Sequence, residues 1–133
     1  MRDVDKVKQG HDNLEWGHIT ESLAAEYFLK DGYTIRERNW RCGKLEIDLI
    51  LEKGNTIIFV EVKARKPGTM DPVEAIDMKK IMRIVNAADS YLQAQMFRYE
   101  YRFDIVAFTG TPEKYEMKHY ADAFVAPVNG GRK

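Results

Sequence analysis

The fold of this chain is decided by the stretch Lys44-Leu45-Glu46-Ile47-Asp48-Leu49-Ile50-Leu51, which is followed after a short turn by Thr56-Ile57-Ile58-Phe59-Val60-Glu61-Val62-Lys63. Both segments alternate in polarity and are rich in β-branched residues, which is typical of strands. Gly54-Asn55 between them suits the tight turn of a β-hairpin. The stretch therefore predicts two neighbouring antiparallel strands.

A turn centred on Gly54-Asn55 fixes which residues of the two strands face each other. On one face, the facing pairs are all apolar: Ile47–Val62, Leu49–Val60 and Leu51–Ile58. A slip of one residue would turn one strand's apolar set to the wrong side, so this continuous face supports the register. The other face then pairs Asp48 with Glu61 and Glu46 with Lys63.

The facing carboxylates of Asp48 and Glu61 need compensation, because like charges directly opposite each other destabilise a sheet. A divalent cation is one candidate, since hard cations such as Mg²⁺ take carboxylates, waters and substrate phosphates as ligands. Lys63 follows Glu61 on the same strand face, where its ammonium would hold a water or a phosphate oxygen beside such a metal. The competing interpretation is a surface hairpin with a solvated acidic pair and a Glu46–Lys63 ion pair.

The chain of 133 residues predicts a single domain over residues 1–133, with flexible segments at 1–11 and 128–133. Its net charge is zero, so nucleic-acid binding would require local clustering of charge. No apolar run approaches the ~20 residues of a membrane span, and the first residues lack the apolar core of a signal peptide. Cys42 is the only cysteine, which excludes an internal disulfide and favours a reducing cytoplasm.

The remaining segments predict two helices and three further strands. Asp12 and Glu15 resemble a capping box, and a helix is expected from there to about Lys30, ended by Asp31-Gly32. Asp71-Pro72-Val73-Glu74 predicts the start of a second helix that runs to about Gln95. Strands are expected at 33–40, 101–108 and 115–120. This order predicts an α/β fold with a central mixed sheet of about five strands flanked by helices.

A third carboxylate, Glu21, lies on the first predicted helix. It shares one stripe at helical spacing with small and apolar residues: Leu14, Gly17, Ala24, Ala25 and Phe28. This stripe is expected to pack against the sheet, and a buried ionised carboxylate is costly unless it is paired or bound to metal. Glu21 therefore either pairs with a Lys or Arg at the edge of that face or joins Asp48 and Glu61.

Asp48, followed by Glu61-Val62-Lys63, resembles the D…(D/E)-x-K signature of the restriction-endonuclease-like nucleases. Further segments occur in the order of the YraN-like bacterial family, over roughly residues 14–108: 17–25, 38–41, 46–50, 59–65, 72–76 with Lys80, and 102–104. The chain is therefore identified as a member of that family, which is similar to archaeal Holliday-junction resolvases. Leu45 and Thr20 stand where the family commonly has glycine, and neither is a candidate catalytic group.

This resemblance implies a restriction-endonuclease-like core and a nuclease that hydrolyses phosphodiester bonds in DNA, including branched or structured DNA, with Mg²⁺ or Mn²⁺ as cofactor. Asp48 and Glu61 would be metal ligands, and Glu21 would complete the acidic cluster directly or through water. Lys63 would orient or help deprotonate the attacking water. One metal or two remain open, and the analogy with resolvases makes a homodimer a candidate assembly.

Basic residues gather on both sides of the hairpin and near the start of the second helix. If they converge, they form a phosphate-binding rim despite the zero net charge; otherwise they belong to an ordinary mixed-charge surface. The expected nucleic-acid-binding residues are Arg41, Lys44, Arg65, Lys66 and Lys80, of which Lys80 matches the family's basic position. Two other functions stay open: a nucleic-acid-binding module without cleavage, and an interaction domain in a DNA-processing complex.

Overall fold

The computed structural model describes residues 2–66, 68 and 76–126, with side chains described from Glu15 onward. These residues form two helices and five strands, in the order α1 (Arg2–Lys30), β1 (Thr34–Cys42), β2 (Leu45–Lys53), β3 (Thr56–Arg65), α3 (Met78–Gln93), β4 (Glu100–Thr111) and β5 (Lys114–Phe124). This is the predicted order. The expected flexible segment 128–133 and the expected helix start at Asp71 lie outside the described residues. None of the described helices has the length and apolar character of a membrane span.

The five strands form one mixed sheet in the order β1-β2-β3-β4-β5. β1–β2, β2–β3 and β4–β5 are antiparallel. β3 and β4 are parallel, because the connection that contains α3 returns the chain to the same end of the sheet. The prediction of an α/β fold with a five-stranded mixed sheet is confirmed, and the arrangement is consistent with a restriction-endonuclease-like core.

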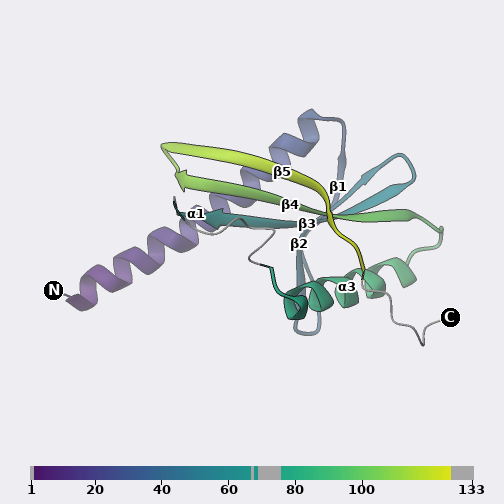
Figure 1. Ribbon diagram of the computed structural model, residues 1–133, viewed down its shortest axis with the longest axis horizontal. Helices are drawn as coiled ribbons and strands as arrows, with labels where there is room; N and C mark the ends of the chain where they lie inside the picture. The colour runs from purple at the N-terminus through teal and green to yellow at the C-terminus, as the bar shows by residue number, and fades with distance from the viewer. Residues whose placement is uncertain (1, 67, 69–75, 127–133) are drawn as a thin grey trace.

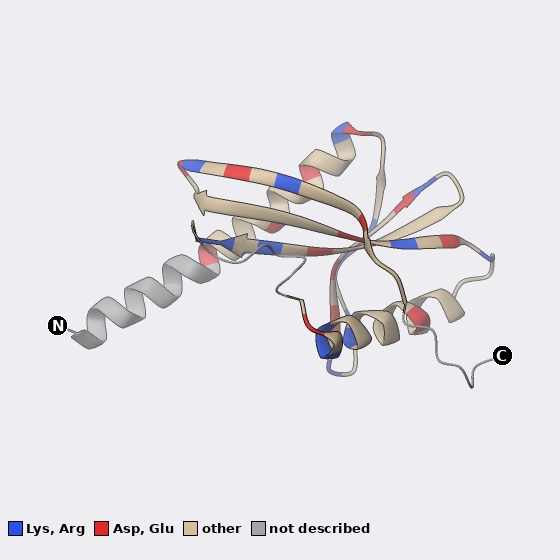
Figure 2. Cartoon of the chain, in the orientation of Figure 1, with Lys and Arg blue, Asp and Glu red and all other residues tan. Residues whose placement is uncertain are grey.

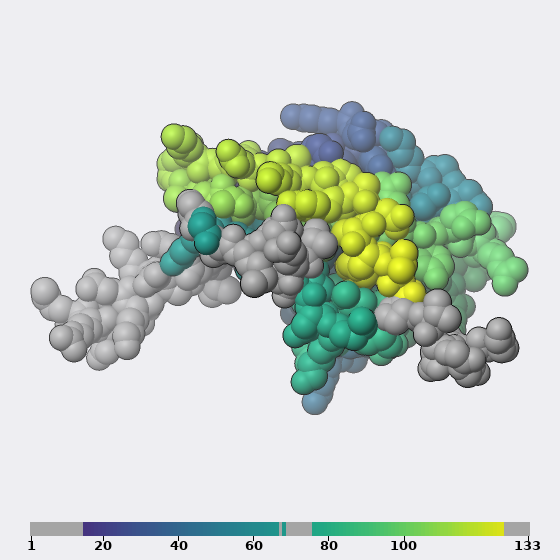
Figure 3. All heavy atoms as spheres, viewed as in Figure 1, coloured from purple at the N-terminus to yellow at the C-terminus, as the bar shows by residue number. Residues whose placement is uncertain are grey.

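The two helices cover opposite faces of the sheet (Figure 1). On one face, α1 residues Ala24, Ala25 and Phe28 pack against Leu49, Leu51, Ile58 and Val60. On the other face, α3 residues Ile84, Ala87, Ala88 and Tyr91 pack against Ile50, Ile57 and Phe59. The end of β5 and the residues that follow it run from the sheet to α3 (Figure 3), where Phe124 and Ala126 join the second layer. The central strands are therefore apolar on both faces, as is usual for strands buried between helices.

The start of the first helix differs from the one predicted. α1 begins at Arg2 and not at Asp12, so the segment expected to be loose is helical from residue 2. A capping box favours a helix start, but it does not prevent a preceding segment without proline from continuing the helix. The predicted end at Lys30 is confirmed, and Gly32 follows it with a φ of 87°. α3 is capped by Asp77, whose carboxylate accepts the N–H of Lys80 at 2.8 Å.

A buried polar network joins β4 and β5 to α1. Asp104 is 0% exposed and accepts hydrogen bonds from Arg102 Nε at 2.9 Å, His119 Nε2 at 2.7 Å and the N–H of Asp122 at 2.9 Å. With Nε2 donating, His119 Nδ1 accepts the hydroxyl of Tyr27 at 2.9 Å. Burial raises the pKa of Asp104, but these hydrogen bonds outweigh burial and hold the pKa below its ordinary value.

Asp104→Asn should lower the free energy of unfolding at pH 7 by about 3–5 kcal/mol, because it leaves Arg102 without its buried counter-charge. The pKa of Asp104 is lower in the folded state than in the unfolded chain, so its stabilisation is complete above pH ~4 and is lost as pH falls through the folded-state pKa. Urea denaturation should show that the difference in the free energy of unfolding between Asp104→Asn and wild type becomes smaller as the pH falls from 7 to 3.

The matched control is Asp89→Asn, which changes a surface carboxylate on α3 that accepts from Gln93. It should change stability by less than ~0.5 kcal/mol. An Asp104→Asn protein as stable as wild type at pH 7 would contradict this account of the network.

Candidate active site

β2 and β3 are paired along only part of their length. Their ladder runs from Lys53–Thr56 to Leu49–Val60, in the predicted register. Beyond Leu49, Asp48 is paired with no residue of the described strands β1 and β3. Next to it in β1, Asn39 adopts a left-handed φ of 50° between the Arg38–Leu49 and Trp40–Ile47 pairs. The sheet is therefore irregular at Asp48.

This irregularity contradicts the facing pairs that were predicted beyond Leu49. Ile47 packs in the layer beside α3 and not on the face of Leu49 and Leu51. Leu45 and Trp40 pack against the same layer as Ile47. Trp40 meets the ring of Tyr91 edge-on, with centroids 5.2 Å apart. Glu46 contacts Arg41, at 3.8 Å, where an ion pair with Lys63 was one predicted alternative. The apolar alternation does not continue through Asp48, because the strand bends there.

The Asp48 side chain takes a place that a strand partner would otherwise occupy. Its Oδ2 accepts the backbone N–H of Val62 at 2.8 Å. Its carboxyl group also shares a hydrogen bond with that of Glu61, which requires one of the two to carry a proton. The two carboxyl groups therefore meet, as predicted, but through their side chains and not through a continuous strand ladder.

Negative charge is concentrated around Asp48. Burial, followed by the hydrogen bond and the negative charge of Glu61, raises the pKa of Asp48 to about 8, while the Val62 N–H acts in the opposite direction. Glu21 on α1 also raises it, so Glu21 lies within electrostatic range of Asp48. Glu21 itself is 3.9 Å from His18 Nδ1. No three Asp, Glu, His or Cys side chains among the described residues gather closely enough to hold a metal ion.

Glu61 stands between two ammonium groups. Its Oε2 lies 3.1 Å from Nζ of Lys80 on α3 and 3.7 Å from Nζ of Lys63 on β3. The Glu61 side chain is 10% exposed, yet Oε2 has no hydrogen-bond partner in the described part of the chain, so both contacts are ion pairs without hydrogen-bond geometry. Buried carboxylate oxygens are normally hydrogen-bonded. The unpartnered oxygen beside Asp48 fits the preference of Mg²⁺ or Mn²⁺ for carboxylate ligands.

The predicted basic residues fall into two regions. Lys63, Arg65 and Lys66 follow Glu61 toward the end of β3, and Figure 2 shows basic residues there and in the first turn of α3, which contains Lys80. Arg41 and Lys44 are exposed at the turn between β1 and β2. Of these residues, Lys63 and Lys80 contact the acidic pair.

Sequence reasoning assigned Lys80 to phosphate binding and missed its contact with Glu61. A local signal was present, because Lys79 and Lys80 occupy the first turn of α3, where no acidic residue stands. Cations are disfavoured at a helix N-terminus by the helix dipole. The N-cap carboxylate of Asp77 and the carboxylate of Glu61 both lie near Lys80, and Glu61 is the one that its ammonium contacts.

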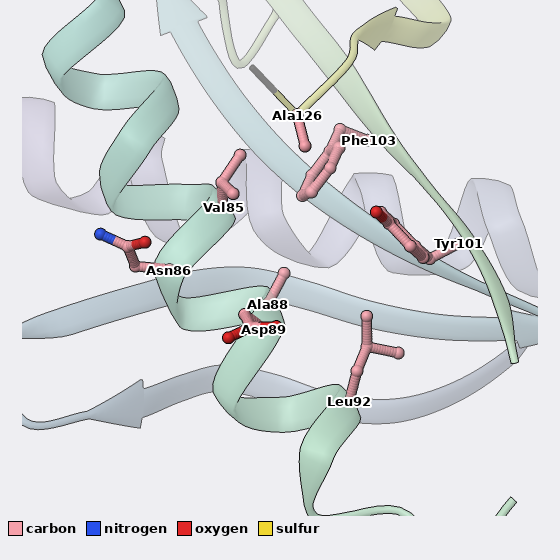
Figure 4. A pocket seen from close by; sticks show the side chains of 8 residues that line it. All are labelled: Val85, Asn86, Ala88, Asp89, Leu92, Tyr101, Phe103 and Ala126. Atoms are coloured by element: carbon pink, nitrogen blue, oxygen red, sulfur yellow. The ribbon is translucent and has the colours of Figure 1, made fainter. Parts of the chain in front are cut away.

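A cavity of about 170 Å³ lies away from the carboxylates, between α3 and β4, and is lined by Val85, Asn86, Ala88, Asp89, Leu92, Tyr101, Phe103 and Ala126. Figure 4 shows that the polar ends of Asn86 and Asp89 point away from the two aromatic rings. Asp89 is engaged by Gln93 Nε2 at 2.9 Å. This apolar lining offers little for water activation or phosphate binding, so the acidic pair is the better candidate site.

Fold and site together define an α/β protein with a mixed five-stranded sheet and a D…E-x-K cluster. The uncharacterised protein family UPF0102 matches residues 20–108. UPF0102 proteins of Phocaeicola vulgatus and Bacteroides thetaiotaomicron are 39% and 38% identical over 115 residues, which cover 86% of this chain and 95% of each relative. A UPF0102 protein of Syntrophus aciditrophicus is 41% identical over 114 residues, covering 84% and 90%. The chain belongs to the UPF0102 family, which confirms the predicted YraN-like membership.

Asp48→Asn should stabilise the protein at pH 8 in the presence of EDTA. The pKa of Asp48 is raised from its ordinary value of 3.8 to about 8, so between these pH values the folded state keeps a proton that the unfolded chain has lost. This group therefore lowers the free energy of unfolding as pH rises, by at most ~1.4 kcal/mol per pH unit. Asparagine stays neutral and should remove this dependence.

Urea denaturation at pH 4, 6 and 8 should show Asp48→Asn and wild type diverging as pH increases. Glu46→Gln is the matched control, because it neutralises an exposed carboxylate of the same strand. Parallel pH dependence in wild type and Asp48→Asn would show that Asp48 does not carry the raised pKa.

Proposed function

We propose that this protein is a metal-dependent nuclease that hydrolyses phosphodiester bonds in DNA, including branched or structured DNA. The observation that carries the proposal is the meeting of Asp48 with Glu61, whose Oε2 lies within 3.7 Å of two lysine ammonium groups and has no hydrogen bond from the residues that the structure describes. Paired carboxylates can hold a divalent metal that activates water for phosphodiester hydrolysis, and a neighbouring lysine supplies positive charge for the attacking water or the phosphate. The D…E-x-K spacing of the sequence supports the same reaction.

In this proposal Asp48 and Glu61 hold Mg²⁺ or Mn²⁺, and Glu21 completes the acidic cluster directly or through water. When bound, the metal lowers the pKa of a coordinated water and neutralises charge on the transition state. Lys63 orients the attacking water and places a positive charge beside it. The Val62 N–H holds Asp48 in position, so the carboxylate needs little reorganisation when it takes up its role.

Positive charge on two sides of the site would bind the phosphate backbone. On one side, the basic residues are Lys80 in the first turn of α3, Arg65 at the end of β3 and Lys66 directly after it. On the other side, the β1–β2 turn contributes Arg41 and Lys44. Local clustering of this kind binds nucleic acid even when net charge is zero. We expect the protein to act in the cytoplasm, and by analogy with resolvases as a homodimer.

A nucleic-acid-binding module without cleavage is the second candidate. It is favoured by the ammonium groups of Lys63 and Lys80, which already compensate the charge of Glu61 without a metal. Such a module would bind DNA through the same basic residues and would not depend on metal. An interaction domain in a DNA-processing complex would bind neither metal nor DNA.

Cleavage of labelled DNA tests the nuclease. Wild-type protein should cut at least one of single-stranded, duplex, flap and four-way-junction DNA with Mg²⁺ or Mn²⁺, and none with EDTA. Asp48→Ala, Glu61→Ala and Lys63→Ala should each lower the rate by at least ~100-fold, because each removes a group that acts in the transition state. Glu21→Ala should also weaken Mn²⁺ binding, but less than Asp48→Ala or Glu61→Ala does, and calorimetric titration measures the three affinities.

Glu46→Ala is the matched control for cleavage, since it removes a carboxylate of β2 that contacts Arg41 and not the acidic pair. Full activity in any one of the Asp48, Glu61 or Lys63 variants would rule out this assignment. DNA binding that needs no metal, with no cutting of any substrate, would favour the binding module.

Nucleic-acid affinity should depend on salt through the basic residues. Arg65→Ala and Lys44→Ala should each weaken DNA binding and lower the slope of log K against log[salt] by ~1, as expected for the loss of one phosphate contact. Fluorescence anisotropy over a range of KCl concentrations measures the slope. Lys114→Ala, at the turn between β4 and β5, is the control, and an equal effect there would indicate only non-specific surface charge.

A further inference from the structure

The contact between Lys80 and Glu61 joins two layers of the molecule. Lys80 lies in the first turn of α3, and Glu61 lies on β3, the central strand of the sheet. Nζ of Lys80 is 3.1 Å from Oε2 of Glu61, which is closer than the 3.7 Å to Lys63 on the same strand as Glu61. Lys80 therefore occupies space next to the oxygen that a cation would bind.

Lys80 is held there by charge alone. Glu61 Oε2 has no hydrogen-bond partner among the described residues, and 40% of the Lys80 side chain remains exposed. A flexible four-carbon stem can move such an ammonium without disturbing the helix. The ammonium therefore compensates the charge of the carboxylate, but no directional hydrogen bond fixes its position.

We propose that Lys80 is the resident counter-ion of Glu61 in the metal-free protein, and that a divalent cation displaces it and frees its ammonium to bind a phosphate of the nucleic acid. This inference rests on the proposed function, because it takes its metal and its nucleic acid from there. It adds two relations between binding events. The metal and the Lys80 ammonium compete for Oε2 of Glu61, whereas metal binding increases the affinity for DNA.

The charges of the site lead to these relations. The carboxyl groups of Asp48 and Glu61 share one proton in the metal-free protein, so together they carry one negative charge against the two positive charges of Lys63 and Lys80. A bound metal would take the place of this proton. A divalent cation adds two positive charges, and its repulsion from an ammonium at ion-pair distance drives Lys80 outward. The excess positive charge then attracts a phosphate, which Lys80 meets at the rim of the site.

Calorimetric titration with Mn²⁺ tests the first half of the proposal. Lys80→Met keeps most of the side-chain length without its charge and should bind Mn²⁺ about five- to tenfold more tightly than wild type, since no ammonium has to be displaced. Lys79→Met is the matched control on the same exposed turn and should bind like wild type. Lys80→Arg restores the charge and should return the affinity toward the wild-type value.

Anisotropy of a labelled four-way junction tests the second half, with Ca²⁺ as a hard cation that takes the same oxygen ligands. In EDTA, Lys80→Met and wild type should bind DNA alike, because Lys80 is then engaged by Glu61. In Ca²⁺, the wild-type affinity should rise more than that of Lys80→Met, by about fivefold for one phosphate contact. A weakening by Lys80→Met that is equal with and without Ca²⁺ would overturn the release of Lys80.

The outcomes separate this inference from the nuclease proposal. Equal Mn²⁺ affinities of wild type, Lys79→Met and Lys80→Met would overturn the counter-ion role and leave the nuclease proposal standing. Tighter Mn²⁺ binding by Lys80→Met, together with no DNA cleavage by wild type, would support the counter-ion role and overturn the nuclease. Absence of Mn²⁺ binding in all of these proteins would overturn both.

Discussion

The arrangement of the candidate site depends on one backbone amide. Buried N–H groups in a sheet must find an acceptor, and Val62 lies where β2 has already separated from β3. Oδ2 of Asp48 accepts this N–H, so the carboxylate substitutes for a strand partner. The same hydrogen bond fixes the direction of the Asp48 side chain and brings it against Glu61. The Asp48 carboxylate is therefore held in place by a backbone N–H that lies beyond the end of the β2–β3 ladder.

Each layer of the fold contributes charge to this point. The sheet supplies Asp48, Glu61 and Lys63, α1 brings the negative charge of Glu21 within range, and α3 brings the positive charge of Lys80. The helices reach the site from opposite faces because the strands carry apolar side chains on both sides. Groups held by packed helices and strands keep their geometry better than groups on loops. The balance of charge at the site is therefore a property of the whole fold.

Local patterns were enough to predict the order of elements, the five-stranded mixed sheet and the register from Lys53 to Leu49, because alternation and the Gly54 turn fix them. They did not predict the separation at Asp48, since Ile47 continues the apolar period of Leu49 and only the packing beside α3 distinguishes it. The Lys80–Glu61 contact depends on how the α3 connection packs. The His119 and Asp122 partners of Asp104 depend on a register shift between Phe103 and Ile105, which leaves no local mark in the sequence.

Two acidic groups of this sheet show that the raised pKa at the candidate site is not a general consequence of burial in this fold. Asp104 is completely buried, yet three donors hold its pKa below the ordinary value. Asp48 receives one backbone N–H, meets a second carboxyl group and has a raised pKa, while Oε2 of Glu61 has no hydrogen bond from the described residues. The same sheet can therefore supply a buried carboxylate with enough hydrogen-bond donors to keep it ionised. Groups left unsatisfied beside such a network are those expected to serve a ligand and not the stability of the chain.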